Sequence, residues 1–191
     1  DEIVCVSDWH RQVMQTTYGL PPETMCVLRN AISPKFEKLF ASREELVSTK
    51  GTRPILAYTS TPFRGLDVLV KVFRELQPEF PEMLLRVYSS MQVYQQPADQ
   101  DQYQALYEAC RSTPGIEYVG SLPQTELAAA LREATIHAYP NTFAETACIA
   151  VMEALAAGLF VVTSDLGALP ETTLGQGQLV SPAKVQSDVP R

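Results

Sequence analysis

The sequence predicts an α/β domain built on a doubly wound, mostly parallel sheet. Short runs rich in β-branched and aromatic residues alternate with segments of helical period, which is typical of βαβ units. The chain has 191 residues, 46% of them hydrophobic and 19% charged, which is enough for the core of one such domain. It has no internal repeat and no low-complexity tract, so we expect a single globular unit.

The first elements in chain order are short. IVCVS at 3–7 predicts a strand, and a helix follows through DWHRQVMQTTYG until Gly19 and Pro21 end it. MCVLRN at 25–30 predicts a second strand, and ISPKFEKLF at 32–40 leads away from it. Residues 41–53 are polar and expected to be exposed, and no element is assigned to them.

A clearer series begins with PILAYT at 54–59, which predicts a strand. The helix after it carries apolar residues spaced by threes and fours, namely Leu66, Leu69, Val70, Phe73 and Leu76. MLLRVYS at 83–89 predicts the next strand, and the polar run 92–102 predicts a loop. An amphipathic helix then carries Tyr103, Leu106, Tyr107 and Cys110. GIEYVG at 115–120 predicts the strand that follows.

The final third continues the alternation. Ser121 and Gln124 match a Ser-x-x-Gln capping box, which predicts a helix through Ala134. TIHAY at 135–139 and LFVVTS at 159–164 predict strands with a helix between them. Gly175 and Gly177 precede a further strand and lack a third glycine, so the dinucleotide fingerprint is absent and no cofactor is expected.

Composition narrows the function classes. A net charge of −7 and a pI near 4.9 argue against nucleic-acid or anionic-membrane binding, so local groups must hold any phosphate. The four cysteines, Cys5, Cys26, Cys110 and Cys148, form no Cys-x-x-Cys pair, so neither a zinc site nor a disulfide is expected. No apolar run approaches about 20 residues, so we expect no transmembrane segment. The predicted location is the cytoplasm.

One block carries most of the chemistry: NTFAETACIAVMEALAAGLFVVTSD at 141–165. Asn141 and Thr142 lie in the loop after a strand, where ligands bind in open α/β sheets. A helix is expected to begin near Thr146 and to point the backbone amides of residues 146–149 into the crevice, with Glu145 at its mouth. Such a terminus favours an anion or sugar hydroxyls.

A second glutamate, Glu153, follows eight residues after Glu145 in an apolar stretch. On one helix the two would lie about 80° apart, so both could face one cleft. A carboxylate that accepts two hydrogen bonds from a ribose diol would explain a charge at this position. The alternative is that Glu145 caps the helix and Glu153 forms a buried ion pair, and the spacing alone favours that alternative.

Two further stretches are candidates. In TSTPFRGLDVLV at 59–70, Ser60 and Thr61 precede Arg64 and Gly65 at the mouth of a helix. The arginine can bind a diphosphate through two oxygens, and the glycine lets the backbone approach a ligand closely. An ordinary turn with a surface arginine is the alternative. Gly120 and Leu122 end a strand where backbone groups could meet a nucleotide base, which is a weak signal by itself.

In this order the motifs resemble the C-terminal, donor-binding domain of a GT-B fold glycosyltransferase, closest to glycosyltransferase family 4, whose fold is Rossmann-like. RNAIS from Arg29 matches the family's early turn, Arg64-Gly65 its basic residue and glycine, and YVGSL its strand end. PNTFAETACIAVMEALAAGLFVVTS matches its carboxylate motif, with DLGALPE after it. The resemblance covers residues 3–181, and four ordered matches favour binding roles for both glutamates.

The resemblance implies a retaining glycosyltransferase of hexosyltransferase type that uses a nucleoside-diphosphate sugar and needs no metal. Glu145 would approach the donor sugar, and Arg64 would neutralise the departing diphosphate; these are the two implied catalytic residues. Glu153 would bind the ribose hydroxyls, and the backbone of Leu122 would contact the base. The implied donor-binding residues are Ser60, Thr61, Arg64, Gly65, Gly120, Leu122, Asn141, Thr142, Glu145, Thr146, Ala147, Cys148, Ile149 and Glu153.

Two departures from the family pattern bear on the site. No second basic residue occurs within 59–63, so diphosphate stabilisation is expected to be weaker or to come from another group. The family's Phe-Gly after the first glutamate is replaced by Thr-Ala-Cys, whose side chains are expected to narrow the sugar pocket.

Residues 1–191 are interpreted as the donor domain of a longer chain. In this family an N-terminal domain, absent here, binds the saccharide, lipid or protein acceptor, so the fragment alone is expected to be inactive. Two other functions stay open: another GT-B enzyme such as a nucleotide-sugar epimerase, and a non-catalytic GT-B-like domain for protein contacts.

Overall fold

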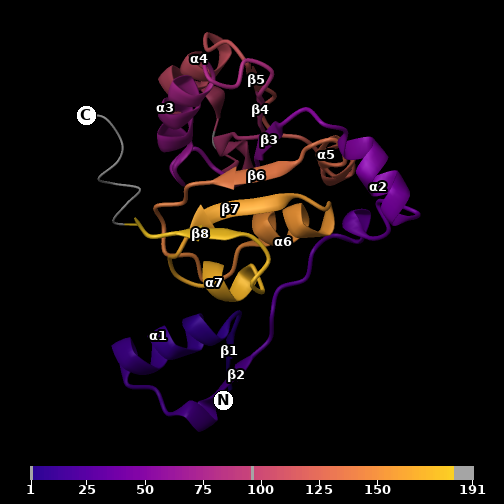
Figure 1. Ribbon diagram of the computed structural model, residues 1–191. Coiled ribbons are helices and arrows are strands. Elements are labelled where there is room, and N and C mark those ends of the chain that lie inside the picture. Colours follow the sequence, from indigo (N-terminus) through magenta and orange to yellow (C-terminus); the bar gives the residue numbers. More distant parts are fainter. Residues whose placement is uncertain (1, 96, 183–191) are drawn as a thin grey trace.

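The computed structural model describes residues 2–95 and 97–182. Its main sheet has six strands, all paired in parallel, in the order β5-β4-β3-β6-β7-β8 (Figure 1). The strands are β3 (Ile55–Tyr58), β4 (Leu84–Val87), β5 (Ile116–Tyr118), β6 (Ile136–Tyr139), β7 (Phe160–Ser164) and β8 (Gln178–Val180). The predicted doubly wound α/β fold is therefore confirmed.

The strand order reverses between β3 and β6. The chain moves outward from β3 through β4 to β5, then returns to lie beside β3 as β6 and continues on the other side. In open parallel sheets, a reversal of this kind opens a crevice at the carboxyl ends of the two strands. The loops that follow β3 and β6 are therefore the expected place for a ligand.

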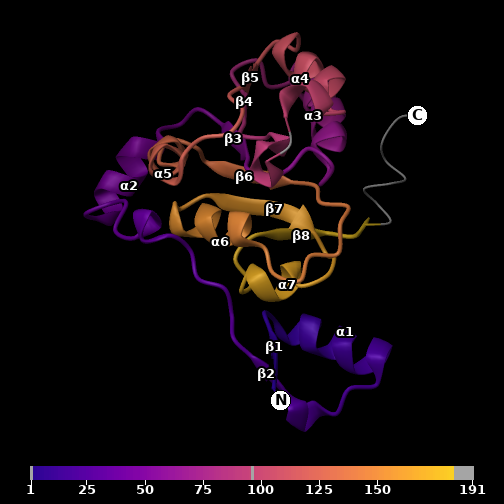
Figure 2. The same cartoon turned by 180° about the vertical axis from the view of Figure 1, so that it is seen from behind.

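Five helices accompany this sheet in the described part of the chain. They are α3 (Leu66–Leu76), α4 (Gln104–Arg111), α5 (Gln124–Leu131), α6 (Ile149–Ala156) and α7 (Leu169–Thr172). Helices α3 and α4 lie together at one side of the molecule, with α5 and α6 at the other, in both views (Figures 1 and 2). Short 3₁₀ turns occupy Pro22–Thr24, Pro34–Phe36, Met91–Tyr94 and Ala98–Gln100.

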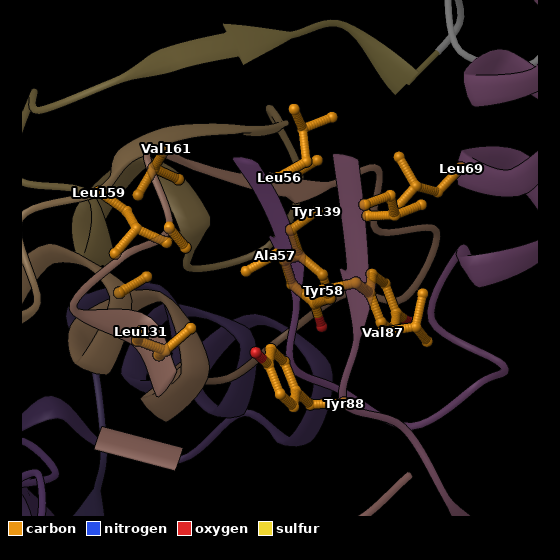
Figure 3. Close-up of a cluster of buried hydrophobic side chains, with 14 of the residues drawn as sticks. Leu56, Ala57, Tyr58, Leu69, Val87, Tyr88, Leu131, Tyr139, Leu159 and Val161 are labelled. Carbon is orange, nitrogen blue, oxygen red and sulfur yellow. The ribbon is translucent and has the colours of Figure 1, made fainter. Parts of the chain in front are cut away.

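The core holds the two strands at the reversal point together. Tyr58 of β3 and Tyr139 of β6 are fully buried, and their ring centroids lie 5.9 Å apart (Figure 3). Aromatic pairs at this separation stabilise by about 0.5–1.5 kcal/mol beyond the area that they bury. Both tyrosines end their strands, so this packing also supports the crevice.

The N-terminal segment lies outside the main sheet. Strands β1 (Ile3–Cys5) and β2 (Met25–Val27) form a separate two-stranded parallel sheet with α1 (Asp8–Tyr18) between them, at the bottom of Figure 1. The carboxylate of Glu171 on α7 accepts hydrogen bonds from the amides of Asp8 at 2.9 Å and Trp9 at 3.2 Å. A carboxylate at a helix start satisfies amides that lack intrahelical partners, so Glu171 joins the segment to the main body.

The polar segment 41–53 is not an unstructured connection, because it contains α2 (Arg43–Lys50). Ser42 caps this helix by accepting from the amide of Glu45 at 3.2 Å, and the Glu45 carboxylate accepts from the amide of Ala41 at 2.7 Å. This is close to a capping box, and its Ser-x-x-Glu pattern was present in the sequence.

Lys50 attaches α2 to the rest of the domain. Its ammonium donates to the carbonyls of Leu131 at 3.1 Å, Ala134 at 2.5 Å and Ala157 at 2.7 Å, which lie at and just beyond the ends of α5 and α6. Cations at helix carboxyl ends satisfy free carbonyls and complement the helix dipole. A polar segment is therefore bound to the body by its charged end.

The predicted capping box at Ser121 is wrong. Helix α5 begins at Gln124 and ends at Leu131, and Pro123 stands at its N-cap without a side-chain hydrogen bond. Pro123 has an extended backbone, with ψ near 149°, so the helix cannot begin before it and Ser121 lies too far upstream to cap it.

Gly65 begins α3 in a left-handed conformation, with φ 96°, and it touches the loop after β6. A Cβ added there would collide with the carbonyl oxygen of Pro140. Gly65→Ala is expected to destabilise the chain by roughly 2–5 kcal/mol, because strain adds to overpacking. Gly19→Ala is the matched control: its φ is 64° with open space around it, so only the strain of about 1–2 kcal/mol is expected. Urea denaturation of both variants measures this, and equal losses would contradict the packing role.

Candidate functional site

A cavity of about 590 Å³ lies at the carboxyl ends of the strands that flank the reversal. It is formed by the loops after β3, β4, β5 and β6 together with the start of α6. The predicted site residues that line it are Ser60, Thr61, Arg64, Leu122, Glu145, Thr146, Ala147, Cys148, Ile149 and Glu153. Ten of the fourteen residues singled out from the sequence therefore share one cavity.

Four predicted residues are not among those that line the cavity. Gly65 faces the carbonyl of Pro140, so its missing side chain makes room for protein backbone and not for a ligand. Asn141 is buried, and its side chain hydrogen-bonds the backbone of Phe143. Thr142 is exposed, and Gly120 lines a smaller neighbouring cavity.

The helix in the carboxylate block begins later than predicted. Helix α6 starts at Ile149, with Cys148 extended at its N-cap, so its first free amides belong to Ile149 and Ala150 and not to Thr146. Glu145 precedes the helix, and the expected 80° relation between the two glutamates is wrong. The reason is tertiary: the amide of Ala168 donates to the carbonyl of Glu145 at 2.8 Å.

Gly167 makes that contact possible. Its φ is 62°, and an added Cβ would meet the backbone of Glu145, with the nearest atom at 2.6 Å. The turn in DLGALPE therefore holds the backbone of Glu145 outside the helix, and the carboxylate reaches the cavity from a loop. The sequence shows this turn but not its role, because the contact joins segments far apart in the chain.

The Glu145 carboxylate is the centre of a polar cluster. Arg64 donates to Oε1 of Glu145 and forms an ion pair with it, and the Tyr139 hydroxyl donates to the same oxygen at 2.6 Å. The side chains of Arg64 and Glu145 are only 20% and 5% exposed, so water screens the pair weakly. Burial alone would lower the pKa of Arg64, but its hydrogen bond and charge interaction with Glu145 raise that pKa above the usual value.

Two aromatic rings lie close to the guanidinium. The Arg64 guanidinium carbon lies 4.9 Å from the ring centroid of Phe143 and 5.5 Å from that of Phe63. Contacts of this kind contribute about 0.5–1 kcal/mol at exposed sites and more when desolvated. Tyr139, Phe143 and Phe63 were not predicted as parts of the site, although Phe63 is next to Arg64 and Phe143 next to Thr142 in the sequence.

Glu153 reaches the cavity from α6 and is 4% exposed. Burial raises the pKa of its carboxyl group, and a hydrogen bond from the Gln124 side chain opposes this only in part. No ion pair to Glu153 occurs among the described residues, so the alternative of a buried salt bridge does not hold there. The ionised form of Glu153 is therefore disfavoured in the folded chain.

Three buried polar atoms at the cavity have no hydrogen-bond partner among the described residues: Thr59 Oγ1, Thr61 Oγ1 and Arg64 Nε. Unsatisfied buried groups are uncommon in folded proteins and call for an explanation such as water or a ligand. All three come from the loop between β3 and α3. Each belongs to a residue that lines the cavity, so hydrogen-bonding capacity that the described residues do not use lies beside it.

Three further features concern metal binding, the cysteines and membrane spanning. Across 2–95 and 97–182, no three His, Cys, Asp or Glu side chains gather where they could hold a metal ion. All four cysteines are free in the structure. In the same ranges, no helix has the length and apolar character needed to cross a bilayer.

Comparison with known proteins shows the family and the fold of the chain. A family model described as glycosyl transferases group 1 matches residues 43–186. The chain is 31% identical over 107 residues to the phosphatidyl-myo-inositol mannosyltransferase of Mycobacterium tuberculosis, covering 56% of this chain and 26% of that protein. A glycosyltransferase structure from Rickettsia africae aligns with TM-score 0.75 at 16% identity, covering 99% of this chain and 51% of that one. Anabaena HepE in complex with UDP-glucose aligns with TM-score 0.70 at 17% identity, covering 98% and 52%.

The extent of these matches differs along the chain. The chain spans about a quarter of the length of the mannosyltransferase and about half of each of the two solved structures. The family match takes in every residue that lines the cavity, whereas residues 1–42 lie outside it.

Proposed function

The chain belongs to the glycosyl transferases group 1 family, and we propose that it binds the nucleoside-diphosphate sugar from which such an enzyme transfers a hexosyl group with retention of configuration. The observation that carries the proposal is the shared cavity, which unites Arg64, Glu145 and Glu153 beside polar atoms that lack partners. The UDP-glucose complex of Anabaena HepE, a protein of the same fold, supports this choice of ligand.

Each group has a distinct role in the proposal. Glu153 accepts hydrogen bonds from the two ribose hydroxyls, which would compensate its buried charge. Glu145 accepts from hydroxyls of the donor sugar. Arg64 and the first amides of α6, at Ile149 and Ala150, bind the diphosphate. The base is assigned to the backbone of Leu122.

The proposed reaction demands stabilisation of leaving-group charge. The bond between the anomeric carbon and the diphosphate oxygen breaks, and the diphosphate departs with the electron pair. The oxygen of the acceptor hydroxyl forms the new bond to the anomeric carbon, and its proton passes to the departing diphosphate. A fixed guanidinium and a helix terminus supply positive potential where that charge develops. Arg64 and α6 provide both, and no metal is part of the proposal.

Arg64 must exchange partners when the donor binds. In the structure its guanidinium is paired with Glu145, and among the described residues that line the cavity it is the one cation. Its Nε has no hydrogen-bond partner among the described residues, and the rings of Phe63 and Phe143 lie beside the guanidinium, so the group has capacity left for a phosphate. A diphosphate that binds Arg64 would break its ion pair with Glu145. The Glu145 carboxylate would then be free to accept hydrogen bonds from the donor sugar.

The acceptor is assigned to a further domain. The proposed partner is a saccharide, lipid or protein acceptor bound by an N-terminal domain, and this chain alone is expected to bind a donor without turning it over. Thr146, Ala147 and Cys148 line the cavity in place of the family's Phe-Gly, and we propose that their side chains restrict the donor sugar.

We expect one of UDP, GDP or ADP to raise the melting temperature of the chain. A ligand that binds only the native state stabilises it by about 2.7 kcal/mol at a hundred times its Kd, which corresponds to a rise of roughly 5–10 °C for a chain of this size. Differential scanning calorimetry with each diphosphate and with its nucleoside as control measures this shift. A flat response to all three at millimolar concentration would favour a protein-contact domain.

A further inference from the structure

We propose that Tyr139 is a positioning residue for Glu145, whose phenol fixes the carboxylate where the donor sugar is bound. The inference rests on the proposed function, which assigns Glu145 to that sugar. Tyr139 ends β6 and is fully buried, and its hydroxyl donates to Oε1 of Glu145 at 2.6 Å. A hydrogen bond to an ionised acceptor is among the stronger ones in proteins.

The tyrosine is anchored independently of any ligand. Its backbone pairs with β7, and its ring packs against the rings of Tyr58 at 5.9 Å and His137 at 5.6 Å. Burial raises the pKa of the Tyr139 phenol, so the hydroxyl keeps its proton and acts as a donor. The hydroxyl therefore occupies one place, whatever the cavity contains.

Arg64 cannot perform the same task. It contacts the same carboxylate oxygen as Tyr139, but in the proposed function it leaves Glu145 for the diphosphate. Ligand binding would then remove the ion pair that helps to direct Glu145. Tyr139 is the partner that stays, so it keeps the carboxylate in place at the moment when the sugar arrives.

The backbone of Glu145 is fixed by contacts other than those of its carboxylate, so only the conformation of the side chain can vary. The amide of Ala168 holds the Glu145 carbonyl at 2.8 Å, and Gly167 packs against the same peptide. With the main chain held on one side and Oε1 on the other, the second carboxylate oxygen has one orientation. Loss of the phenol would free the side chain to follow Arg64.

The test compares two ligands in Tyr139→Phe, which keeps the ring and loses the hydroxyl. The ligands are the nucleoside diphosphate that stabilises the chain and its glucose or mannose conjugate, titrated by calorimetry. We expect affinity for the conjugate to fall about tenfold, the effect of one net hydrogen bond to a charged group. Affinity for the diphosphate alone should stay within about twofold, since Glu145 does not contact it. A purely structural role would weaken both ligands equally.

Tyr107→Phe is the matched control. Tyr107 is also buried, and its hydroxyl also donates to a carboxylate oxygen, that of Asp101 at 2.8 Å, outside the cavity. Tyr107→Phe loses the same kind of hydrogen bond as Tyr139→Phe, so the two variants are expected to have similar melting temperatures. Its ratio of the two affinities should equal that of the wild type.

A second variant shows whether Tyr139 acts through Glu145. In a Glu145→Gln background, Tyr139→Phe should change the affinity for the conjugate by less than about twofold, because coupled residues are not additive. The role of Tyr139 would be overturned by a tenfold loss of affinity for the conjugate in the Glu145→Gln background. It would also be overturned if Tyr139→Phe alone left the ratio of the two ligand affinities unchanged. Wild-type protein that binds neither ligand would instead refute the proposed function, and this role with it.

Discussion

Glu153→Gln is expected to weaken nucleoside-diphosphate binding by roughly ten- to a hundredfold, the range for hydrogen bonds to a charged acceptor. Without ligand, the same variant should melt at an equal or higher temperature than the wild type. The amide has nearly the shape of the carboxylate but carries no charge to desolvate. A residue that costs stability and contributes binding is the pattern expected of a functional site.

The effect of Glu153 on stability should depend on pH. Burial raises the pKa of Glu153 above its unfolded value, so between the two values the folded chain binds more protons than the unfolded chain. The stability of the folded chain therefore falls as the pH rises through that window. Above the folded pKa, the full free-energy cost of burying the ionised carboxylate is present. Glu153→Gln should remove this slope from the melting temperatures measured across the acidic range.

Glu126→Gln is the control for this variant. Glu126 lies exposed on α5, outside the cavity lining, so its loss of charge should change neither ligand binding nor the pH slope. If Glu153→Gln bound the nucleoside diphosphate as tightly as the wild type, the ribose role of Glu153 would be wrong. A lower melting temperature without ligand would show that the carboxylate serves the fold instead.

Arg64→Met is expected to lower the free energy of unfolding by about 2–4 kcal/mol, because it leaves Glu145 buried without its cationic partner. It should also abolish detectable binding of a nucleoside diphosphate, since no other described residue that lines the cavity is a cation. Urea denaturation and calorimetry measure the two effects separately. Methionine keeps much of the length and apolar packing of the arginine stem, so the charge is the main change.

Addition of Glu145→Gln separates the two causes. The double variant has no unpaired buried charge, so most of the lost stability should return while nucleotide binding stays absent. Should the double variant be no more stable than Arg64→Met, the ion pair would not be the source of the loss. Recovery of binding in the double variant would contradict the assignment of Arg64 to the diphosphate.

The fold was predictable because its signals are local. Alternating periods located β3 to β7 and most helices of the main body, and the parallel arrangement follows from short strands separated by helices. Helix α2 was missed although Ser42 and Glu45 carry a capping signal, because its polar composition suggested an exposed connection. The sequence also does not show that β1 and β2 form a sheet of their own, since strand partners are a tertiary property.

The residues of the site could be predicted from the sequence more fully than their arrangement in space. Motif order brought Arg64, Glu145 and Glu153 together, and the cavity does unite them. The position of Glu145 outside the helix depends on Gly167, and the contact of Tyr139 with Glu145 depends on the conformation of the intervening loop. Neither contact has a period or spacing from which the sequence alone could derive it.

The central claim is most directly tested by a crystal structure of the chain with the nucleoside diphosphate that stabilises it. We expect the ribose within hydrogen-bond distance of Glu153, and the phosphates on Arg64 and the first amides of α6, with Arg64 released from Glu145. A nucleotide bound elsewhere, with the Arg64–Glu145 pair intact and the cavity without nucleotide density, would contradict the account.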